Sequence, residues 1–600
     1  MASNSKSDWR LGASVGALNA VDEPPRAAQI FGGDETGGEA ASKAALERLN
    51  RAVAELNALQ AGPLLERAVA AIKAEDGDTA SKLAIEALQH DEKNGFGWHV
   101  LAIAREMCGD FKSSIAAYES ALALLADHTD VANDLGRLAF RLGMKPLAAK
   151  LFAVFHQARP DNIDGANNLA CALRDLHEYA AAIELLQGAI PKNPGSAMLW
   201  NTLATVLSAK GETASAIPFL EEALRLDPAF AKARYNLANA KLELGDPDAA
   251  LADCDAAMAQ AATPGDLAMM RLARSTILLC AGRVGEGWDD YEARFDPAFS
   301  DLTHFMTDRP RWSPDTSPKG KSVLVIGEQG LGDEIMFANL IPDLLEEVGP
   351  DGQLAIAVEA RLVGFFQRAF PAAHVSAHTT YKLDGHTVRA APDAPAAETL
   401  DLWTPLATPL RRYRRSVAAF PDRAHYMTAD PTRVDHWRAW ASSLPGKSVG
   451  LVWKSLKLDG VRLREFSPFE QWRGVLQTPG LSFVNLQYGE CEAELAAARE
   501  RLGVTIHQAP GIDLKDDLDE VAALVCALDL VLGPANATTN IAGACGAATW
   551  LISTPIAWTR LGTSRYPWYP QSRVFTPSRF GQWDKVMAEV VEALGAFAVS

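Results

Sequence analysis

Residues 327–335 read GEQGLGDEI and place three carboxylates among three glycines. A carboxylate can take a proton from a bound hydroxyl, and glycine lets the backbone turn tightly and approach a ligand. The apolar run 323–326 comes directly before this segment, and a helical pattern begins at Met336. Because α/β domains build their sites where a strand ends and a helix begins, the segment predicts a ligand site at the carboxyl end of a sheet.

The elements that must position this segment form an α/β region behind residue 320. Apolar runs separated by helical patterns predict its strands, at 323–326, 354–358, 449–453, 482–487, 529–532 and 548–552. A proline-containing break near 421–446 divides the region into halves 321–445 and 446–600. The pattern predicts two doubly wound, Rossmann-like domains facing across a cleft, which is the architecture of GT-B glycosyltransferases.

The front part of the chain repeats with a period of 34 residues, marked by Pro160, Pro194 and Pro228. In the same register, one position holds small residues (Ser114, Ala148, Ala182, Ala216, Ala250) and another holds larger ones (Tyr118, Phe152, Leu186, Leu220, Cys254). A small residue at a helix crossing and a large one a turn later suit a stacked helical hairpin. The pattern resembles the tetratricopeptide repeat over 61–298. We expect an all-α solenoid at 41–298, a disordered segment at 1–40, and a linker with three prolines at 299–320.

A polar ladder runs through the repeats, formed by Asn133, Asn167, Asn168, Asn201 and Asn236. An asparagine amide both donates and accepts, so a row of them can hold the backbone of an extended peptide whatever its sequence. The ladder predicts an acceptor-binding surface for another protein. The alternative is that these amides bond between neighbouring repeats or only face solvent.

Composition excludes several functions. The chain carries a net charge of −18, and residues 61–300 hold 33 acidic and 22 basic side chains, so we expect no nucleic-acid partner. No signal peptide and no bilayer-spanning stretch is visible, which favours a cytoplasmic protein without membrane insertion. Seven scattered cysteines predict reduced, mostly buried thiols, and no metal-ligand spacing occurs.

Several strings behind the linker carry a family resemblance. They are GEQGLGDEIMFANLIPDL, VGLVWKS, FVNLQYGE, LDEVAALVCALDLVLGPANATTNIAGACG and PWYP, in this order. Together with the repeats, they resemble bacterial tetratricopeptide-repeat GT-B glycosyltransferases, and most of all the flagellin glycosyltransferases of that group. The resemblance implies a bacterial enzyme that transfers a nonulosonic acid such as pseudaminic acid, from its CMP-activated form, to Ser/Thr hydroxyls of flagellin. It implies a nucleotide-sugar co-substrate, CMP- or UDP-linked, and no metal or other cofactor.

The resemblance also assigns roles to residues. Asp333 is the expected general base and Glu328 its alternate, while Glu334 is expected to be solvated; a helix-capping role for Asp333 stays open. The expected donor-binding residues are Lys454, Arg464, Gln487, Tyr488, Gly489, Asn536, Thr538, Thr539 and Asn540, with Arg462 beside them. Trp568 and Tyr569 either wall the sugar pocket or pack in the core. The run 411–415, RRYRR, could attract an anionic sugar acid, but an exposed helical face is the favoured interpretation.

One departure from the family matters. Many relatives carry Asp-Thr-Ala-x-x-His where residues 535–540 read ANATTN. The acid and the histidine are missing, so no role that rests on them is carried over. What remains is a polar turn that opens a helix and suits a phosphate or a sugar, or that serves only as a helix cap.

Two other functions stay open. One is a UDP-sugar protein O-glycosyltransferase of the N-acetylglucosamine type, and the other is a tetratricopeptide-repeat scaffold whose transferase region has lost activity. The order of glycines at 327–332 does not match the dinucleotide-binding fingerprint, and no GxxxxGK[ST] loop occurs, which argues against an NAD enzyme or an NTPase.

Overall fold

The computed structural model describes residues 39–299, 301–383, 386–456, 462 and 464–599. The predicted N-terminal segment 1–40 therefore lies outside the described residues, apart from its last two, which begin a helix. The chain forms two compact units, one ending at Leu138 and the other beginning at Ala139. Each is described by itself.

The first unit consists of helical hairpins whose helices start in the same way. Asp76, Asn94 and Asp110 cap three of these helices, each accepting from the backbone N–H three residues later at 2.9–3.1 Å. Such caps are worth about 1 kcal/mol each and fix where a helix begins. The helices are α2 (Glu39–Lys73), α3 (Gly77–His90), α4 (Gly95–Met107), α5 (Phe111–Leu124) and α6 (Thr129–Arg141), the last of which crosses the boundary between the units.

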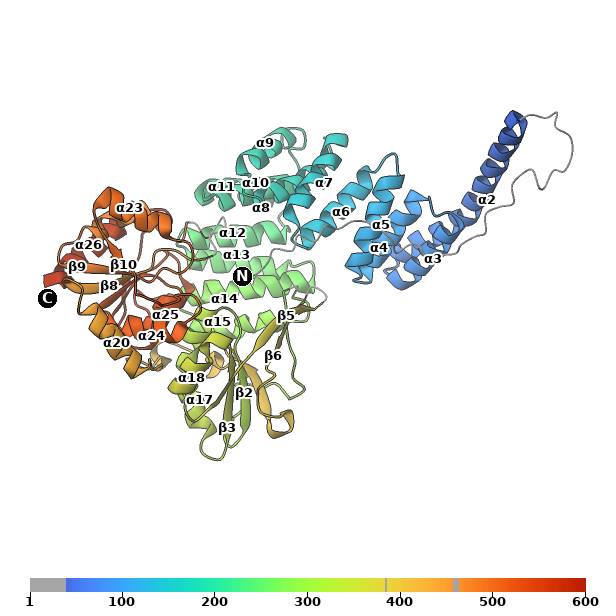
Figure 1. The fold of residues 1–600 in the computed structure, drawn as a ribbon. Coiled ribbons are helices and arrows are strands. Elements are labelled where there is room, and N and C mark those ends of the chain that lie inside the picture. The colour runs from blue at the N-terminus through green and yellow to red at the C-terminus, as the bar shows by residue number, and fades with distance from the viewer. Residues whose placement is uncertain (1–38, 300, 384–385, 457–461, 463, 600) are drawn as a thin grey trace. The chain divides into compact units, whose positions relative to one another are not determined.

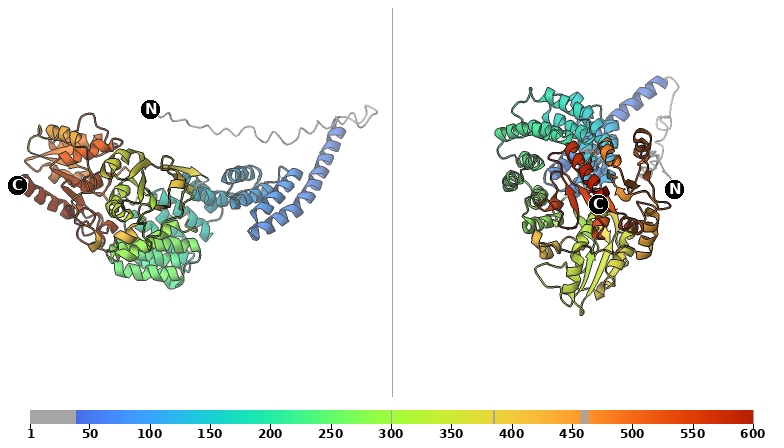
Figure 2. Two further views of the ribbon diagram at one scale, coloured as in Figure 1. Left: turned by 90° about the horizontal axis from the view of Figure 1, so that it is seen from below. Right: turned by 90° about the vertical axis from the view of Figure 1, so that its left-hand side faces the viewer.

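The second unit opens with further hairpins, whose consecutive helices stack side by side in Figures 1 and 2. The alanines at the small position of the repeat, from Ala148 to Ala250, are all 0% exposed, and the larger position is buried as well. The predicted 34-residue period is thus confirmed at the level of packing. The helices are α7 (Lys145–Ala158), α8 (Ile163–Asp175), α9 (Tyr179–Ala189), α10 (Ala197–Lys210), α11 (Thr213–Leu226), α12 (Ala231–Glu243), α13 (Pro247–Ala259), α14 (Pro264–Cys280), α15 (Val284–Tyr291) and the 3-10 helix η1 (Glu292–Phe295).

A four-stranded parallel sheet follows, with strand order β4-β3-β2-β7. Alternate residues of its central strand β2 face opposite sides: Val323 and Val325 pack under helices, whereas Leu324 and Ile326 belong to a smaller cluster with Leu400. The strands and helices are β2 (Ser322–Ile326), α16 (Leu331–Phe337), η2 (Ala338–Leu340), α17 (Ile341–Val348), β3 (Gln353–Val358), η3 (Ala360–Leu362), α18 (Val363–Ala369), β4 (His374–Ala377), η4 (Ala397–Thr399) and β7 (Leu402–Pro405).

A small sheet of order β1-β6-β5 lies in part within the predicted linker. Strand β1 (Thr303–Phe305) pairs in parallel with β6 (His386–Ala390), which pairs antiparallel with β5 (Thr379–Leu383). Trp312 is 2% exposed and joins the core under the larger sheet. Residues 301–320 of the predicted linker are therefore a structured part of the fold, because they form a strand and contribute a tryptophan to the core.

The last part contains a six-stranded, all-parallel sheet of order β10-β9-β8-β11-β12-β13. Helices α23 and α26 lie on one face and α24 and α25 on the other (Figure 1). The elements from the end of the first half onward are α19 (Leu410–Tyr413), η5 (Val417–Ala419), α20 (Pro431–Ala441), β8 (Lys447–Leu451), η6 (Phe469–Trp472), α22 (Arg473–Leu476), β9 (Leu481–Asn485), α23 (Glu492–Leu502), β10 (Ile506–His507), α24 (Leu518–Ala527), β11 (Leu530–Pro534), α25 (Ala537–Ala544), β12 (Thr549–Ile552), η7 (Trp558–Arg560), β13 (Arg573–Phe575) and α26 (Trp583–Val599).

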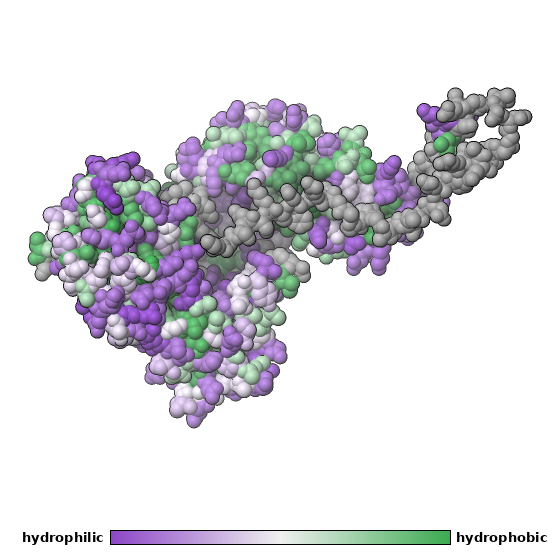
Figure 3. Space-filling view, viewed as in Figure 1, coloured by the Kyte–Doolittle hydropathy of each residue, from purple (hydrophilic) through white to green (hydrophobic). Residues whose placement is uncertain are grey.

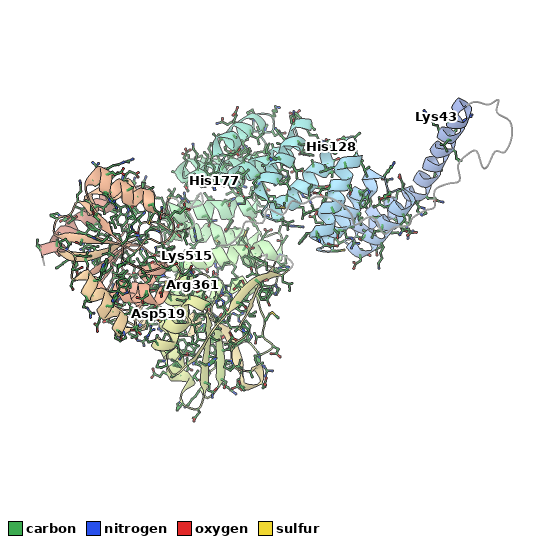
Figure 4. The ribbon with its side chains drawn as sticks, in the orientation of Figure 1. Lys43, His128, His177, Arg361, Lys515 and Asp519 are labelled. Atoms are coloured by element: carbon green, nitrogen blue, oxygen red, sulfur yellow. The ribbon has the colours of Figure 1, made fainter. Side chains whose placement is uncertain are left out.

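The two larger sheets are joined by ion pairs and a common core. Arg368 forms a bidentate pair with Asp519 at 2.7 Å, and Arg361 donates to the Lys515 carbonyl at 2.9 Å; Arg361, Lys515 and Asp519 lie close together in Figure 4. One hydrophobic cluster runs from the helices of the first sheet to α24 and α25. On the face shown in Figure 3, the α/β part carries mainly hydrophilic residues. The α/β region is thus a single packed body.

Candidate functional site

A cavity of about 400 Å³ opens beside the loop 327–335, and three parts of the second unit supply its walls. The first sheet contributes Gln329, Asp333 and Met336, and the second contributes Ala535, Asn540, Trp558, Thr559 and Tyr566, with Arg462 alongside. The last repeat adds Ser275, Thr276, Leu279, Trp288 and Tyr291. The site predicted from the loop therefore lies between two strand-to-helix turns, with the repeat as a third wall.

Helices α16 and α25 begin next to each other at this cavity. The Asn540 side chain donates from Nδ2 to the Gly332 carbonyl at 2.9 Å. A Cβ at Gly332 would lie 3.0 Å from that nitrogen and 3.4 Å from the backbone nitrogen of Ala537, so this position favours glycine. The glycine of the loop is what allows the two helix starts to approach so closely.

Asp333 lines the cavity and lies in the first turn of α16. Burial raises the pKa of Asp333 to about 6, and the charges of Glu328 and Glu334 add to the rise. The Gly330 N–H, 3.4 Å from Oδ2, and the charge of Arg462 oppose it. A carboxylate with a pKa near 6 is ionised at pH 7 and is a stronger base than an ordinary aspartate.

Glu328, expected as the alternate base, has a structural role instead. Its two carboxylate oxygens each accept from Arg294 of η1 at 2.9 Å, and Oε1 also accepts from the Ala407 N–H at 2.9 Å. Both side chains are buried, with about 5% exposed. Burial opposes the charge on Arg294, but the adjacent carboxylate raises its pKa overall. Glu328 is held by its partners and is not among the residues that line the cavity.

The expectation that Glu334 is solvated is wrong. Glu334 is 1% exposed, accepts from the Glu359 N–H at 2.9 Å, and lies 2.8 Å from Nε2 of His378. On the same side, buried Arg389 donates to the Gly327 carbonyl at 2.6 Å. These buried groups hold the backbone of the loop on the side away from the cavity. Of the three acids of the loop, Asp333 is the one that lines the cavity.

The predicted donor residues at the ends of β8 and β9 mostly bond to the protein. The Gln487 side chain is 2% exposed; its Oε1 accepts from the N–H groups of Trp453 and Lys454 at 3.1 and 2.9 Å, and its Nε2 donates to the Tyr488 carbonyl. The Lys454 ammonium pairs with Glu494. Gln487 thus positions two strand ends rather than contacting a nucleotide, and Lys454 has an acidic partner.

Tyr488 and Gly489 follow as a turn. Burial raises the pKa of Tyr488, so its hydroxyl stays protonated. Gly489 has φ +81°, and a Cβ there would lie 2.8 Å from the Leu456 side chain. The turn therefore needs glycine for its own conformation, and neither residue lines the cavity.

The two arginines predicted in the loop after β8 lie in different surroundings. Arg462 is exposed and lines the cavity opposite Asp333. Arg464, predicted to bind the donor, instead forms a bidentate pair with Glu243 of α12, at 2.6 and 2.9 Å. Of the two, only Arg462 is placed to meet an anion in this cavity.

The residues of the polar turn 535–540 also have different roles. Asn536 and Thr539 form a reciprocal capping box, in which each backbone N–H donates to the other side chain at 2.9 and 3.1 Å. Thr538 is buried at 3% exposure. Asn540 is 6% exposed, and among the described residues its Oδ1 has no hydrogen-bond partner. The capping explanation holds for Asn536 and Thr539, whereas Asn540 presents a buried polar atom at the cavity.

Trp568 and Tyr569 pack in the core. Each is 1% exposed; Trp568 lies against Trp288 and Phe337, and Tyr569 covers Gly543, where a Cβ would come within 2.5 Å of the ring. The aromatic residues that line the cavity are Trp288, Tyr291, Trp558 and Tyr566, which sequence reasoning missed. Tyr566 directly precedes the string PWYP at 567–570, whereas nothing in the repeat pattern indicates a role for Tyr291.

The asparagine ladder bonds between neighbouring repeats, as the alternative interpretation allowed. The Thr202 hydroxyl donates to Asn167 Oδ1 at 2.6 Å, and Asn236 Nδ2 donates to Asn201 Oδ1 at 2.8 Å. Asn167 Nδ2 reaches Asn168 Oδ1 at 3.4 Å, and Asn133 and Asn168 also take part in further contacts. These bonds tie repeat to repeat, while Asn236 also lines a groove of about 290 Å³.

The run 411–415 is bound to neighbouring helices through ion pairs and does not form a free helical face. Arg414 is 2% exposed and binds Asn339 and Asp343, and Arg412 pairs with Glu347. Arg411 and Arg415 both pair with Asp289 of α15. These four arginines fasten the segment to the helices on either side.

Among the described residues, no group of three or more His, Cys, Asp or Glu could hold a metal ion, and no helix is long and apolar enough to cross a membrane. The seven cysteines are free thiols; Cys254 and Cys491 are buried, but Cys108 is exposed, so the expectation of mostly buried thiols holds only in part.

The fold and the sequence define the class of protein. Residues 102–163, 167–229 and 207–272 match the tetratricopeptide-repeat family. The chain is thus a tetratricopeptide-repeat protein with an α/β region behind its solenoid, and such repeats bind other proteins.

A relative along nearly the full length gives the particular family. Protein FlbA of Caulobacter vibrioides is 52% identical over 564 residues, which cover 94% of each chain. The chain belongs to the family of this protein. The peroxisomal targeting signal receptor of Candida glabrata matches over 68 residues at 35% identity, covering 11% of this chain and 12% of the receptor.

A solved tetratricopeptide-repeat protein from Parabacteroides merdae is 15% identical and covers 39% of this chain and 91% of its own, with a TM-score of 0.35. So low a score carries no argument here.

Proposed function

We propose that this protein is a metal-independent GT-B glycosyltransferase that moves a sugar from a nucleotide-sugar donor to Ser/Thr hydroxyls of a protein acceptor. The proposed donor is a CMP-activated nonulosonic acid such as pseudaminic acid, and the proposed acceptor is flagellin, bound in the cytoplasm. The donor and the acceptor rest on the resemblance of residues 327–344 and of the strings behind them.

The observation that carries the proposal is the surroundings of Asp333. This acid lines a cavity of about 400 Å³ with its pKa raised to about 6, and Arg462 and Asn540 line the same cavity. A base, a cation and the start of a second helix in one cavity are the groups that sugar transfer needs.

In the proposed reaction, the acceptor hydroxyl oxygen attacks the anomeric carbon while its proton passes to Asp333. The bond from that carbon to the donor phosphate oxygen breaks, and the electron pair leaves with the phosphate. Arg462 and the N–H groups that open α25 then stabilise the added negative charge. Attack from the side opposite to the leaving group inverts the anomeric centre.

One observation favours the second candidate, a scaffold without activity. Asn536 and Thr539 are used in capping α25, and Lys454 pairs with Glu494, so the donor side retains few uncommitted groups. A UDP-sugar transferase of the N-acetylglucosamine type uses the same base and leaving-group chemistry, and donor choice alone distinguishes it.

The test uses the full chain with purified flagellin and either CMP-pseudaminic acid or UDP-N-acetylglucosamine, and reads the intact mass of flagellin. We expect a mass increase with the CMP donor and none when Asp333 is replaced by Asn. Absence of any increase, together with no thermal shift of the protein by CMP or UDP, would overturn the enzyme proposal in favour of the scaffold.

A further inference from the structure

A second cavity lies in the repeats, away from the transferase cavity. It is a groove of about 290 Å³ lined by residues of α10 and α12, by Arg174 of α8 and Leu220 of α11, and by Arg464 from the second half of the α/β region. Thr205, Ser208, Asn236, Asn239 and Glu243 give it a polar lining. Asn236 belongs to the asparagine ladder, so this groove is where the ladder reaches a hollow surface.

Glu243 is the acid of this groove. Its side chain is 18% exposed and accepts from the Thr213 hydroxyl at 2.6 Å. Arg174, one of the two basic residues of the lining, bonds to Asp175 and to the Thr205 hydroxyl. Arg464 aside, this largely buried carboxylate accepts from the neutral Thr213 hydroxyl, which lies outside the lining, and such a carboxylate attracts a cation.

A guanidinium from a distant part of the chain fills this place. Arg464 reaches Glu243 with two bonds of 2.6 and 2.9 Å and also points a nitrogen at the Ser208 carbonyl, 3.4 Å away. Its Nε is buried and has no partner within the described residues. The fit shows that the groove accommodates an arginine side chain end-on, although not every donor of this arginine is satisfied.

We propose that this groove binds an arginine or lysine side chain of the protein acceptor, and that Arg464 holds the place until the acceptor displaces it. The groove provides a carboxylate for the cation, and amides and hydroxyls for the flanking peptide backbone. That the partner is the acceptor rests on the proposed function; that the groove takes a cationic side chain does not.

Two substitutions that break the same ion pair should then have opposite effects. Arg464→Ala frees the carboxylate and strengthens binding of a cationic peptide, whereas Glu243→Gln removes the attraction and weakens it. If the pair served only to hold the fold together, both substitutions would act in the same direction. This difference in sign makes the proposal testable.

The experiment measures binding of fluorescein-labelled Ser-Ala-Arg-Ala-Ser to the full chain by fluorescence anisotropy, with the citrulline peptide as the neutral counterpart. We expect Arg464→Ala to bind the arginine peptide about tenfold more tightly than the unaltered protein, and Glu243→Gln and the double variant to bind it no better than the citrulline peptide. Lys192→Ala, which breaks the exposed pair with Asp161, should change nothing.

Equal binding by the Arg464→Ala and unaltered proteins, or retention of the gain in the double variant, would overturn the proposal. Arg464→Met serves as the second variant, because it removes the guanidinium, which lies over the Phe580 ring, but keeps an unbranched side chain of similar length. The assay contains no nucleotide sugar. A protein that shows the opposite effects yet transfers no sugar would therefore contradict the proposed function and leave the cation site standing.

Discussion

The starts of α16 and α25 occupy equivalent places, each just after a parallel strand, yet they are built in opposite ways. The loop before α16 is fixed from behind by buried charges, namely Arg294 on Glu328 and Arg389 on the Gly327 carbonyl. The turn before α25 is fixed by its own side chains, through the capping box of Asn536 and Thr539.

The difference shows how one side chain is left available for chemistry. Because other groups hold the first loop, Asp333 is only weakly engaged as a cap, 3.4 Å from the Gly330 N–H, and keeps a raised pKa. In the second turn the polar side chains are used in holding the turn itself. A loop supported from outside can carry a base, whereas a loop that supports itself supplies mainly backbone N–H groups.

The largest effect expected from this comparison is the loss of the proposed sugar transfer in Asp333→Asn. Removing a general base lowers the rate by about 10²- to 10⁴-fold, and the matched control Asp351→Asn, at an exposed position, should leave it unchanged. Because only the ionised form accepts a proton, the rate of the unaltered protein should fall as the pH drops below about 6. Rates of flagellin modification by intact mass, from pH 5 to 8, measure both. A rate for Asp333→Asn within tenfold of normal would remove Asp333 as the base.

Arg294→Met should be the most damaging change to the fold of the first loop. It leaves the Glu328 carboxylate buried without its cation, which costs about 3–5 kcal/mol of unfolding free energy. Urea unfolding followed by tryptophan fluorescence measures the loss. The double variant Arg294→Met/Glu328→Gln should recover part of it, since no buried charge then remains unpaired. A double variant as unstable as the single one would show that packing, not charge, decides.

Thr539→Ala tests the self-supporting turn. Loss of a capping side chain costs about 1–2 kcal/mol, while Thr539→Ser keeps the hydroxyl and should cost less. The same unfolding measurement applies. If Thr539→Ser and Thr539→Ala were equally unstable, the lost methyl group rather than the cap would be responsible.

The smallest expected effect is a change in stability that distinguishes a helix-capping role of Asp333 from a role as general base. Folding raises the pKa of Asp333 from its ordinary value of 3.8 to about 6, so the unfolding free energy falls as the pH rises from about 4 to about 6 and stays lower above pH 6. Asp333→Asn should therefore be more stable than the unaltered protein by about 1 kcal/mol at pH 8, after allowing for solvent screening, and equal to it near pH 4. Thermal melts at both pH values report this. Destabilisation at pH 8 would show that capping dominates.

Sequence reasoning succeeded where a pattern repeats or a run is apolar. The alanine positions of the repeats and the runs that became β2, β3, β8, β9, β11 and β12 were predicted close to their observed bounds. Short strands such as β4 and β10 escaped because two to four residues give no clear pattern. The site was predicted only in part. The raised pKa of Asp333 needs burial, and the partners of Glu328 and Arg464 lie 34 and 221 residues away.

The pairing of Arg294 with Glu328 bears on how this protein could be re-engineered. The solenoid ends in residues that share a core with the first sheet, Trp288 among them, so a cut at residue 298 would divide one hydrophobic interior. Chimaeras that exchange repeats with a relative should place the junction before α14. The last hairpin is then kept together with the α/β region against which it packs, and the repeats before it are exchanged.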